Sequence, residues 1–266
     1  SAFVSARLAA RAIETYPGQL PQSLSEAYAV QDLAIAAWPE PVVGWKVGRI
    51  NGDDVALHGT DRLAGPIFPS QVTTASSAPS GMPVFRGGFA AIEGECVIIA
   101  SRDAPATKTD WTHEEATDMI GAIHAGVEIA SSPFAGINDF GPLVTISDFG
   151  NNFGLVVGEE IPNWRELAID DWAFETILDG TCVGRSTPAG IPGGPVESFR
   201  FILENAARRG LPIKKGSVIS TGAVTGVHVA SISQLATVKA TGVQDIRVHL
   251  IEAAPRTESA DAPGAL

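Results

Sequence analysis

The segment Phe89-Ala-Ala-Ile-Glu-Gly-Glu-Cys-Val-Ile-Ile-Ala100 ends in an apolar run that predicts a β-strand, yet it carries two carboxylates, Glu93 and Glu95. Because side chains alternate in direction along a strand, both acids project from one face and lie close together. The strand is apolar on both faces, which is typical of a strand that is covered on both sides. The two acids are therefore expected to lie away from bulk water.

Two like charges held close together in a buried place raise each other's pKa unless a cation lies between them. A bound divalent metal ion is the simplest arrangement that accommodates Glu93 and Glu95. The alternative is that both acids lie at a solvated start of the strand. The spacing alone leaves both interpretations open.

The bulk properties describe a globular protein. A chain of 266 residues, 45% hydrophobic, can bury one large core or two modest ones. Thirty Asp and Glu against 18 Lys and Arg give a net charge of -12, which disfavours nucleic acid or an anionic membrane as a partner. Two cysteines, Cys96 and Cys182, form neither a metal-ligand spacing nor a disulfide framework. With neither a long apolar run nor a signal-peptide pattern at the start, a cytoplasmic location is expected.

Three parts are expected along the chain: an N-terminal helical segment (residues 1–41), a β-rich domain (42–252) and a disordered tail (253–266). The first part predicts helices over residues 2–13 and from Ser23 or Ser25 to about Trp38, where Ser23 and Glu26 fit a capping box. Residues 49–82 and 134–152 are expected to be loop-rich.

In the β-rich part, Thr112 and Glu115 form a capping box for a helix expected from His113 to Ala125, with Ile120 and Ile123 in its buried stripe. A short strand over residues 127–130 follows. It holds Glu128, a third acid in a setting that is expected to be buried.

Later segments predict a strand over 153–158, a hairpin over 172–182 with a tight turn at Asp179-Gly180, and a helix over 195–209 that ends at Gly210. Strands are expected over 217–221, 226–230, 234–239 and 245–251. This order predicts an α+β fold with a dominant antiparallel or mixed sheet. No Gly-x-Gly-x-x-Gly follows a strand, so a dinucleotide-binding fold has no support.

Lys46 lies in a short strand between Gly44 and Gly48. A lysine in an apolar, β-prone strand is unusual. One interpretation is a functional cation inside the protein; the other is a lysine on an edge strand whose stem covers apolar surface while its ammonium group reaches water.

Several segments together resemble the fumarylacetoacetate hydrolase superfamily, and within it the 2-keto-4-pentenoate hydratase / 4-oxalocrotonate decarboxylase branch. They are Gly44-Trp-Lys-Val-Gly48, Gly65-Pro-Ile-Phe68, Ile92-Glu-Gly-Glu95, Val127-Glu-Ile129, Gly193-Gly-Pro195 and Gly216-Ser-Val-Ile-Ser-Thr-Gly222. Their order and approximate spacing hold from about Ala27 to Ile251. The resemblance implies a mixed β-sandwich-like roll with an N-terminal helical segment and outer helices.

The resemblance further implies that Mg²⁺ or Mn²⁺ is held by Glu93, Glu95 and Glu128. A hard cation prefers oxygen ligands, and three carboxylates leave about three of six octahedral positions for water and substrate. A 2-keto acid can fill two of these positions, and its enolate is then stabilised by the metal. Lys46 takes the position of the family's active-site lysine, as proton donor or acceptor, and its pKa is expected to fall near the cation.

The resemblance also supplies the expected substrate contacts, which are Gly65, Phe68, Asn151, Thr221 and Gly222. Thr221 and Gly222 match a Thr-Gly pair near the substrate carboxylate, where a hydroxyl and a backbone N–H can donate; the alternative is a plain strand-ending turn. Three departures from the family pattern concern the substrate tail and the second proton-transfer group. They are Ala64 in place of an acid, Pro133 in place of an arginine, and Asp148-Phe-Gly-Asn151 in place of Asp-Asn-Ala-Ser.

The expected function is a Mg²⁺-dependent hydro-lyase, a hydratase or dehydratase of aromatic catabolism, acting on a small 2-keto acid such as 2-keto-4-pentenoate through a metal-bound enolate. The alternatives are a 2-keto diacid decarboxylase of the 4-oxalocrotonate type, a C–C bond hydrolase or tautomerase at the same site, and a diverged 2-keto acid binder without turnover. Hydrolysis would need a base; His124, on the helix expected there, is a candidate, and a structural role is the more common alternative for such a histidine. Family members commonly assemble, so a homo-oligomer is expected.

Overall fold

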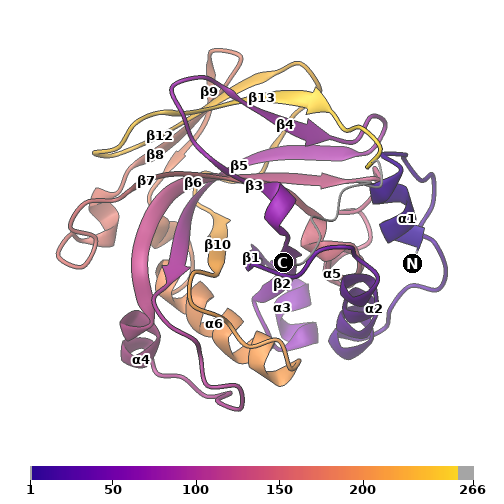
Figure 1. Cartoon of the computed structure of the whole chain (residues 1–266), viewed down its shortest axis with the longest axis horizontal. Helices are drawn as coiled ribbons and strands as arrows, with labels where there is room; N and C mark the ends of the chain where they lie inside the picture. The colour runs from indigo at the N-terminus through magenta and orange to yellow at the C-terminus, as the bar shows by residue number, and fades with distance from the viewer. Residues whose placement is uncertain (1, 257–266) are drawn as a thin grey trace, which may run out of the picture.

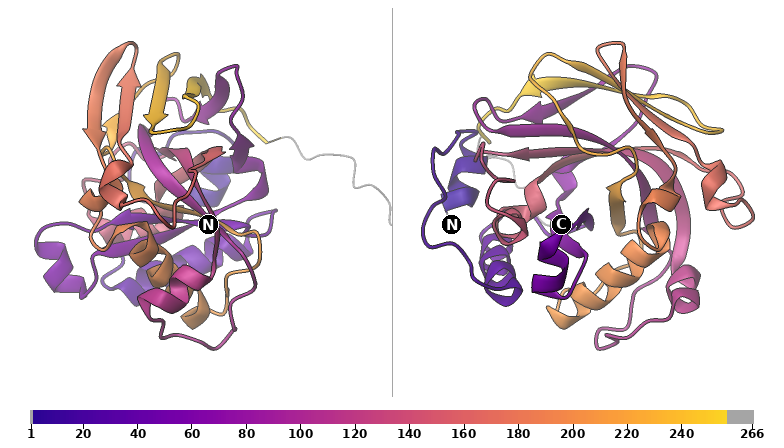
Figure 2. Two further views of the ribbon diagram at one scale, coloured as in Figure 1. Left: turned by 90° about the vertical axis from the view of Figure 1, so that its left-hand side faces the viewer. Right: turned by 180° about the vertical axis from the view of Figure 1, so that it is seen from behind.

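The structure is a computed structural model that describes residues 2–256, and two β-sheets dominate it (Figure 1). The larger sheet has the strand order β2-β1-β10-β5-β6-β7-β3, with β11 also paired to β5; the smaller has the order β4-β13-β12-β8-β9. Figures 1 and 2 show the smaller sheet on one side of the long strands β5, β6 and β7, and helices α2, α3 and α6 on the other. The predicted α+β class and the mixed sheet are confirmed.

The strands of the larger sheet are β1 (Gly44–Arg49), β2 (Arg62–Ile67), β3 (Val72–Thr74), β5 (Phe89–Ala100), β6 (Ile120–Ser132), β7 (Asn152–Glu160), β10 (Val218–Ala223) and β11 (His228–Val229). Those of the smaller sheet are β4 (Ser80–Val84), β8 (Phe174–Leu178), β9 (Thr181–Ser186), β12 (Leu235–Ala240) and β13 (Ile246–Glu252). The helices are α1 (Ala2–Leu8), α2 (Leu24–Ala36), α3 (Asp53–His58), α4 (His113–Asp118), α5 (Pro142–Ser147) and α6 (Gly194–Arg208), with short 3₁₀ turns η1 (Pro69–Gln71), η2 (Phe149–Asn151), η3 (Ile169–Asp171) and η4 (Pro188–Gly190).

Strand β5 is a central strand, and this explains why its sequence is apolar on both faces. It pairs with β6 along its whole length and with β10 and β11 on its other edge. Ile92, Cys96 and Ile98 pack into the main core, whereas Val97 on the opposite face belongs to a smaller buried cluster. Glu93 and Glu95 share the face of Val97, so both are inside the protein.

The prediction of a helix over residues 113–125 is correct only for its first residues and wrong for the rest. The Thr112–Glu115 capping box forms, but α4 ends at Asp118 and β6 begins at Ile120. Ile120 and Ile123 are buried, as expected, but in a strand. The pairing of β6 with β5 on one side and β7 on the other outweighs the local helical pattern. The short strand expected over 127–130 is the end of this 13-residue strand.

Elsewhere the predicted elements differ mainly in length. Helix α1 ends at Leu8, five residues before Ile13, whereas α2 matches its prediction and Ser23 Oγ accepts from the Glu26 N–H. The segment expected to be loop-rich over 49–82 contains α3, β2 and β3, and that over 134–152 contains α5. The β8–β9 hairpin turns at Asp179-Gly180, both with positive φ, as a tight hairpin turn requires.

Both ends of the described chain pack on the body of the protein. The Ala253 N–H bonds to the Val84 carbonyl, and Arg256 pairs with Glu40 at 2.7 Å. The remainder of the tail that was expected to be disordered, residues 257–266, lies outside the described residues. In the part of the chain that is described, no helix has both the length and the apolar character to cross a bilayer.

Candidate metal centre and the cavity beside it

Three glutamates converge inside the larger sheet. Glu93 and Glu95 come from β5, and Glu128 lies on β6 directly opposite Glu93 in the antiparallel ladder. One carboxylate oxygen of each lies within 4.8 Å of the others, and all three side chains are buried. The strand alternation that predicts a shared face for Glu93 and Glu95 thus also brings in Glu128, and the solvated alternative is wrong.

An irregularity in β10 holds Glu95 in place. The β10–β5 register shifts between Ser220 and Ala223, and Gly222 takes φ 114°, a conformation that favours glycine. As a result the Ser220 hydroxyl and the Gly222 N–H, the latter at 2.9 Å, both donate to Oε2 of Glu95. One oxygen of this carboxylate is therefore fixed by the protein, and the other is left for a different partner.

The remaining carboxylate oxygens fit a hard cation. Glu95 Oε1 and Glu128 Oε2 are buried without a hydrogen-bond donor among the described residues, and Glu128 Oε1 has the Lys46 ammonium group 3.3 Å away. Buried carboxylate oxygens without a partner are costly, because they lose water and gain nothing in exchange. Mg²⁺, Ca²⁺ and Mn²⁺ prefer oxygen ligands, and three carboxylates provide such a ligand set. The residues present therefore fit a divalent cation.

Burial and mutual repulsion make these acids resist ionisation in the metal-free protein. Desolvation, helped by the charge of Glu128, raises the pKa of Glu93 to about 7. Desolvation also raises the pKa of Glu95 well above its usual range, with Glu128 and Glu93 adding to the effect. A bound divalent cation would offset both effects and lower these pKa values, because it stabilises the ionised form of each carboxylate.

Lys46 is beside this cluster and not on an edge strand. Strand β1 lies between β2 and β10, so the edge-strand alternative is wrong. The buried Nζ lies 3.3 Å from Glu128 Oε1 and donates to Asn151 Oδ1 at 3.4 Å. Burial alone lowers the pKa of Lys46, but the charges of Glu128, Glu93 and Glu95 outweigh it and raise that pKa in the metal-free protein. The decrease in the pKa of Lys46 that is expected beside a cation applies to the metal-bound protein.

A strained turn presents Asn151 to Lys46. Phe149, Gly150 and Asn151 take φ values of 55°, 62° and 56°, an uncommon run of left-handed residues. Gly65 of β2 packs directly under this turn, where a Cβ atom would lie 2.1 Å from the Phe149 carbonyl oxygen. Phe68 stacks with Trp38 and contacts Phe149 edge-on. Gly65 and Phe68, expected to contact substrate, thus lie behind the turn.

Thr221 and Gly222 line the cavity, but their donors already have partners in the protein. The Thr221 hydroxyl donates to the Cys96 carbonyl at 2.8 Å, and the Gly222 N–H donates to Glu95. Neither donor is free for a substrate carboxylate in this structure. His124, the candidate base for hydrolysis, lies on β6 with Nδ1 2.9 Å from the Gly158 carbonyl oxygen, and it is not among the residues that line the cavity.

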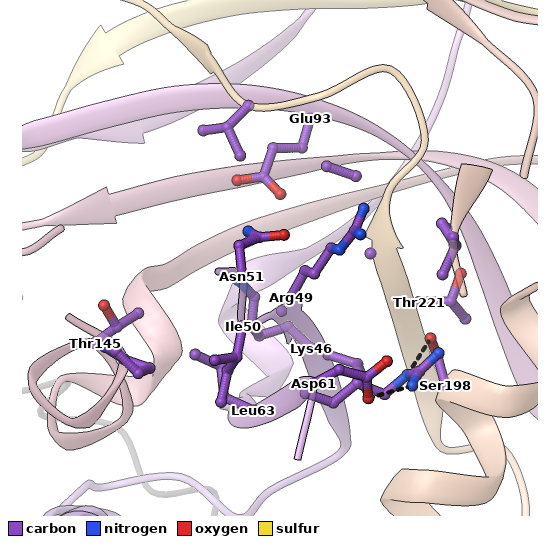
Figure 3. A pocket seen from close by; sticks show the side chains of 18 of the residues that line it. Lys46, Arg49, Ile50, Asn51, Asp61, Leu63, Glu93, Thr145, Ser198 and Thr221 are labelled. Atoms are coloured by element: carbon purple, nitrogen blue, oxygen red, sulfur yellow. Dashed lines mark hydrogen bonds and ion pairs between the residues drawn. The ribbon is translucent and has the colours of Figure 1, made fainter. Parts of the chain in front are cut away.

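A cavity of about 570 Å³ opens beside Glu93, one of the three glutamates (Figure 3). Glu93 lies on one side of it, and Asp61 and Ser198 lie on the opposite side, with Arg49 and Asn51 between them in this view. The sequence interpretation did not include several polar side chains that line this cavity, among them Arg49, Asn51, Asp54, Arg62 and Ser198. Arg49 could have been predicted as a cavity residue from the sequence, because it ends the strand that carries Lys46. Nothing near Ser198 in the sequence indicates that it lines the cavity.

The departures from the family pattern have structural roles here. Ala64 is fully buried, and its backbone bonds to Tyr28 and Gln31. The Pro133 carbonyl accepts from the Ile13 N–H at 2.9 Å, which ties the segment after α1 to the end of β6. Asp148 accepts from Arg7 and from the Ser132 hydroxyl. The side chains of Ala64 and Pro133 do not line the cavity, whereas Asn151 of the third departure does line it and accepts from Lys46.

Two known proteins match this chain in sequence. The chain is 26% identical over 214 residues to a 2-keto-4-pentenoate hydratase of Burkholderia vietnamiensis (76% of this chain, 78% of that protein). It is 25% identical over 229 residues to a 2-keto-4-pentenoate hydratase of Paraburkholderia phymatum (80% and 84%). No family model matches the sequence.

Among solved structures, 4-oxalocrotonate decarboxylase from Pseudomonas putida G7, complexed with magnesium and adipate, has a TM-score of 0.77 at 19% identity, covering 94% of this chain and 95% of that one. Fumarylpyruvate hydrolase from Pseudomonas aeruginosa, in complex with Mn²⁺ and pyruvate, has a TM-score of 0.56 at 15% identity (80% and 91%). These likenesses confirm the predicted fold, and the sequence relatives confirm the suspected branch.

Proposed function

We propose, from the likeness to the 2-keto-4-pentenoate hydratase / 4-oxalocrotonate decarboxylase branch of the fumarylacetoacetate hydrolase superfamily, that this chain is a Mg²⁺- or Mn²⁺-dependent hydro-lyase acting on a small 2-keto acid. The observation that supports it best is the convergence of Glu93, Glu95 and Glu128 beside Lys46, with carboxylate oxygens that have no donor among the described residues. Such a cluster is unfavourable in itself and becomes favourable with a cation bound.

In this proposal each residue has a physical task. Glu93, Glu95 and Glu128 hold the cation, and Ser220 with Gly222 keeps Glu95 in one orientation. When bound, the cation supplies positive charge toward the 2-keto group and so favours negative charge on the substrate during reaction. The cavity next to Glu93 receives the carbon chain of the substrate and limits the access of bulk water.

Lys46 is the proposed proton donor and acceptor. Its ammonium group is buried and lies between Glu128 and Asn151, so its orientation is fixed from two directions. Addition of water to a carbon–carbon double bond conjugated with the keto group places a proton on C3 of the substrate, and the reverse reaction removes it. A single lysine facing the cavity can serve in both directions.

The decarboxylase reaction is the second candidate, since the chain covers nearly the whole of the P. putida decarboxylase at a TM-score of 0.77. Both reactions need the same charge stabilisation at the keto group, and they differ in the bond that breaks. A panel of unsaturated 2-keto acids, followed by NMR, separates them. Release of carbon dioxide supports the decarboxylase, a 4-hydroxy-2-keto acid supports the hydratase, and cleavage to an acid and a ketone supports the hydrolase.

The test of the proposed function combines metal removal with Glu95→Gln. This variant keeps an oxygen that accepts from Ser220 and Gly222 but loses the negative charge. Turnover is expected to stop after EDTA treatment, to return with Mg²⁺ or Mn²⁺, and to be absent in Glu95→Gln. Glu114→Gln, which changes an exposed glutamate of α4, is the matched control and is expected to behave like the unaltered protein. Full turnover by metal-stripped protein excludes the proposal, and metal-dependent binding of 2-keto acids without turnover identifies a binder.

A further inference from the structure

Two arginines face each other at the end of the β1–β2 ladder, beside the cavity. Arg49 and Arg62 are directly opposite in the antiparallel register, and both line the cavity. Like charges in directly opposite positions of a ladder destabilise it. A pair of this kind is therefore expected to have anionic partners that offset the repulsion.

Arg62 has such partners within the protein. Its guanidinium pairs with Asp61 at 2.5 Å and donates to the Pro192 carbonyl and to Ser198 Oγ. Its side chain is only 8% exposed, so these contacts fix it firmly. The Arg62–Asp61 pair is neutral as a unit, and it forms part of the cavity wall.

Arg49 has no such partner among residues 2–256. Its side chain makes no hydrogen bond, ion pair or aromatic contact there. Asp54 also lines the cavity, but its recorded contact is with the ring of His58, 4.0 Å away, and not with Arg49. In Figure 3 the side chain of Arg49 extends into the space between Glu93 and the Asp61–Ser198 side. The cavity therefore carries an unpaired guanidinium, a group that binds carboxylates through two parallel hydrogen bonds.

The position of Arg49 along β1 suits the far end of a short substrate. Arg49 is three residues after Lys46 on the same strand, which corresponds to about 10 Å between their Cα atoms. Side chains three residues apart leave a strand on opposite faces, but these two long side chains line the same cavity, so their charged ends can lie closer together than the Cα atoms. A 2-keto acid with its keto group beside Lys46 can therefore reach the guanidinium with its other end.

We infer that Arg49 binds a second carboxylate at the far end of the substrate, and that this chain selects 2-keto diacids over 2-keto monoacids. The inference rests on the proposed function, because it takes the keto end of the substrate to lie at the three glutamates. It adds a specificity-determining residue, and it narrows the substrate class to small 2-keto acids with two carboxylates.

The test compares two ligands that differ only at the far end, 2-oxohexanoate and 2-oxoadipate. Each is titrated by calorimetry into Mg²⁺-loaded protein, for the unaltered chain and for Arg49→Gln. Because a hydrogen-bonded charge pair is typically worth one to two powers of ten in affinity, the diacid is expected to bind about 10- to 100-fold more tightly. In Arg49→Gln the diacid is expected to bind no better than the monoacid, and the affinity of the monoacid stays the same.

Arg11→Gln is the matched control, since Arg11 is an exposed arginine outside the cavity. Equal binding of both ligands to the unaltered protein overturns the inference and leaves the proposed function intact. Loss of the diacid preference in Arg11→Gln as well as in Arg49→Gln also overturns it, because the preference then reflects overall charge. Failure of both ligands to bind in the presence of Mg²⁺ overturns the proposed function together with the inference. Arg49 is exposed, so its substitution is not expected to disturb folding, and a thermal melt checks this.

Discussion

Arg7 and Asp148 form a fully buried ion pair, with 2.6 Å between Nε and Oδ1, although they are 141 residues apart in the sequence. Arg7 also donates to the carbonyl oxygens of Ser131, Asp148 and Asn152. These contacts begin and end the turn that presents Asn151 to Lys46. The first helix of the chain is thereby tied to the candidate site.

Substitution of Arg7 by methionine is expected to destabilise the protein by about 3–5 kcal/mol, because it leaves the charge of Asp148 buried without its partner. Urea denaturation measures the loss. The double variant Arg7→Met with Asp148→Asn is expected to lose less unfolding free energy than the two single variants lose in sum, since it removes both charges. Additive losses would show that the pair is not coupled.

Alanine at Gly65 is expected to destabilise the protein by about 1–3 kcal/mol, because its Cβ would lie 2.1 Å from the Phe149 carbonyl oxygen and the backbone there cannot yield freely. The same change at Gly81, where the nearest atom is 3.5 Å away on a side chain, is the control and is expected to cost far less. Thermal melts compare the two variants. Equal stability of both would contradict the close packing under the turn.

The stability of the metal-free protein is expected to fall as the pH rises from about 4.5 to 7. The pKa of Glu93 is raised from 4.5 to about 7 in the folded state, so its contribution is fully present below the unfolded pKa and is lost as the pH rises through the folded pKa. The pKa of Glu95 is raised as well, so its contribution to stability also falls as the pH rises. Denaturation series in EDTA measure the slope, and Glu93→Gln is expected to reduce it. With Mg²⁺ present the stabilisation should grow with pH, since ionised carboxylates bind the cation.

Methionine at Lys46 is expected to lower turnover by about 10²- to 10⁴-fold, the usual contribution of a general acid or base. The same change removes a buried positive charge from beside Glu128, so the affinity for Mg²⁺ is expected to rise or to stay equal. Calorimetric titration with Mg²⁺ gives the second result independently of any substrate. A variant that loses both turnover and Mg²⁺ binding would point to a collapsed site.

The site residues that were predictable from the sequence lie on strands with a clear alternation. Glu93 and Glu95 share a face because they are two residues apart, and the β-branched neighbours of Glu128 indicate its burial. The burial of Lys46 had two interpretations, since its neighbour β10 begins at Val218, far along the chain. Whether a strand is central or at an edge depends on such distant pairing, which no local pattern encodes.

The errors have the same origin. The segment from His113 to Ala125 has helical capping and helical spacing, yet only its first half forms a helix, because its second half lies between β5 and β7. Arg7 was placed in a helix correctly, but nothing near it in the sequence reveals Asp148. Arg49 and Arg62 meet only because β1 and β2 pair in one register.

The opposition of Glu93 and Glu128 also bears on how the chain reaches its native pairing. A slip of β5 by one residue against β6 would turn Glu93 and Glu95 toward the opposite side from Glu128. In the native alignment the acids repel one another until a cation joins them, whereas a slipped alignment offers that cation no common site. Under the proposed metal binding, an ion that binds only the native β5–β6 register stabilises that register by mass action. The cation would then favour correct strand pairing over a slipped pairing during folding.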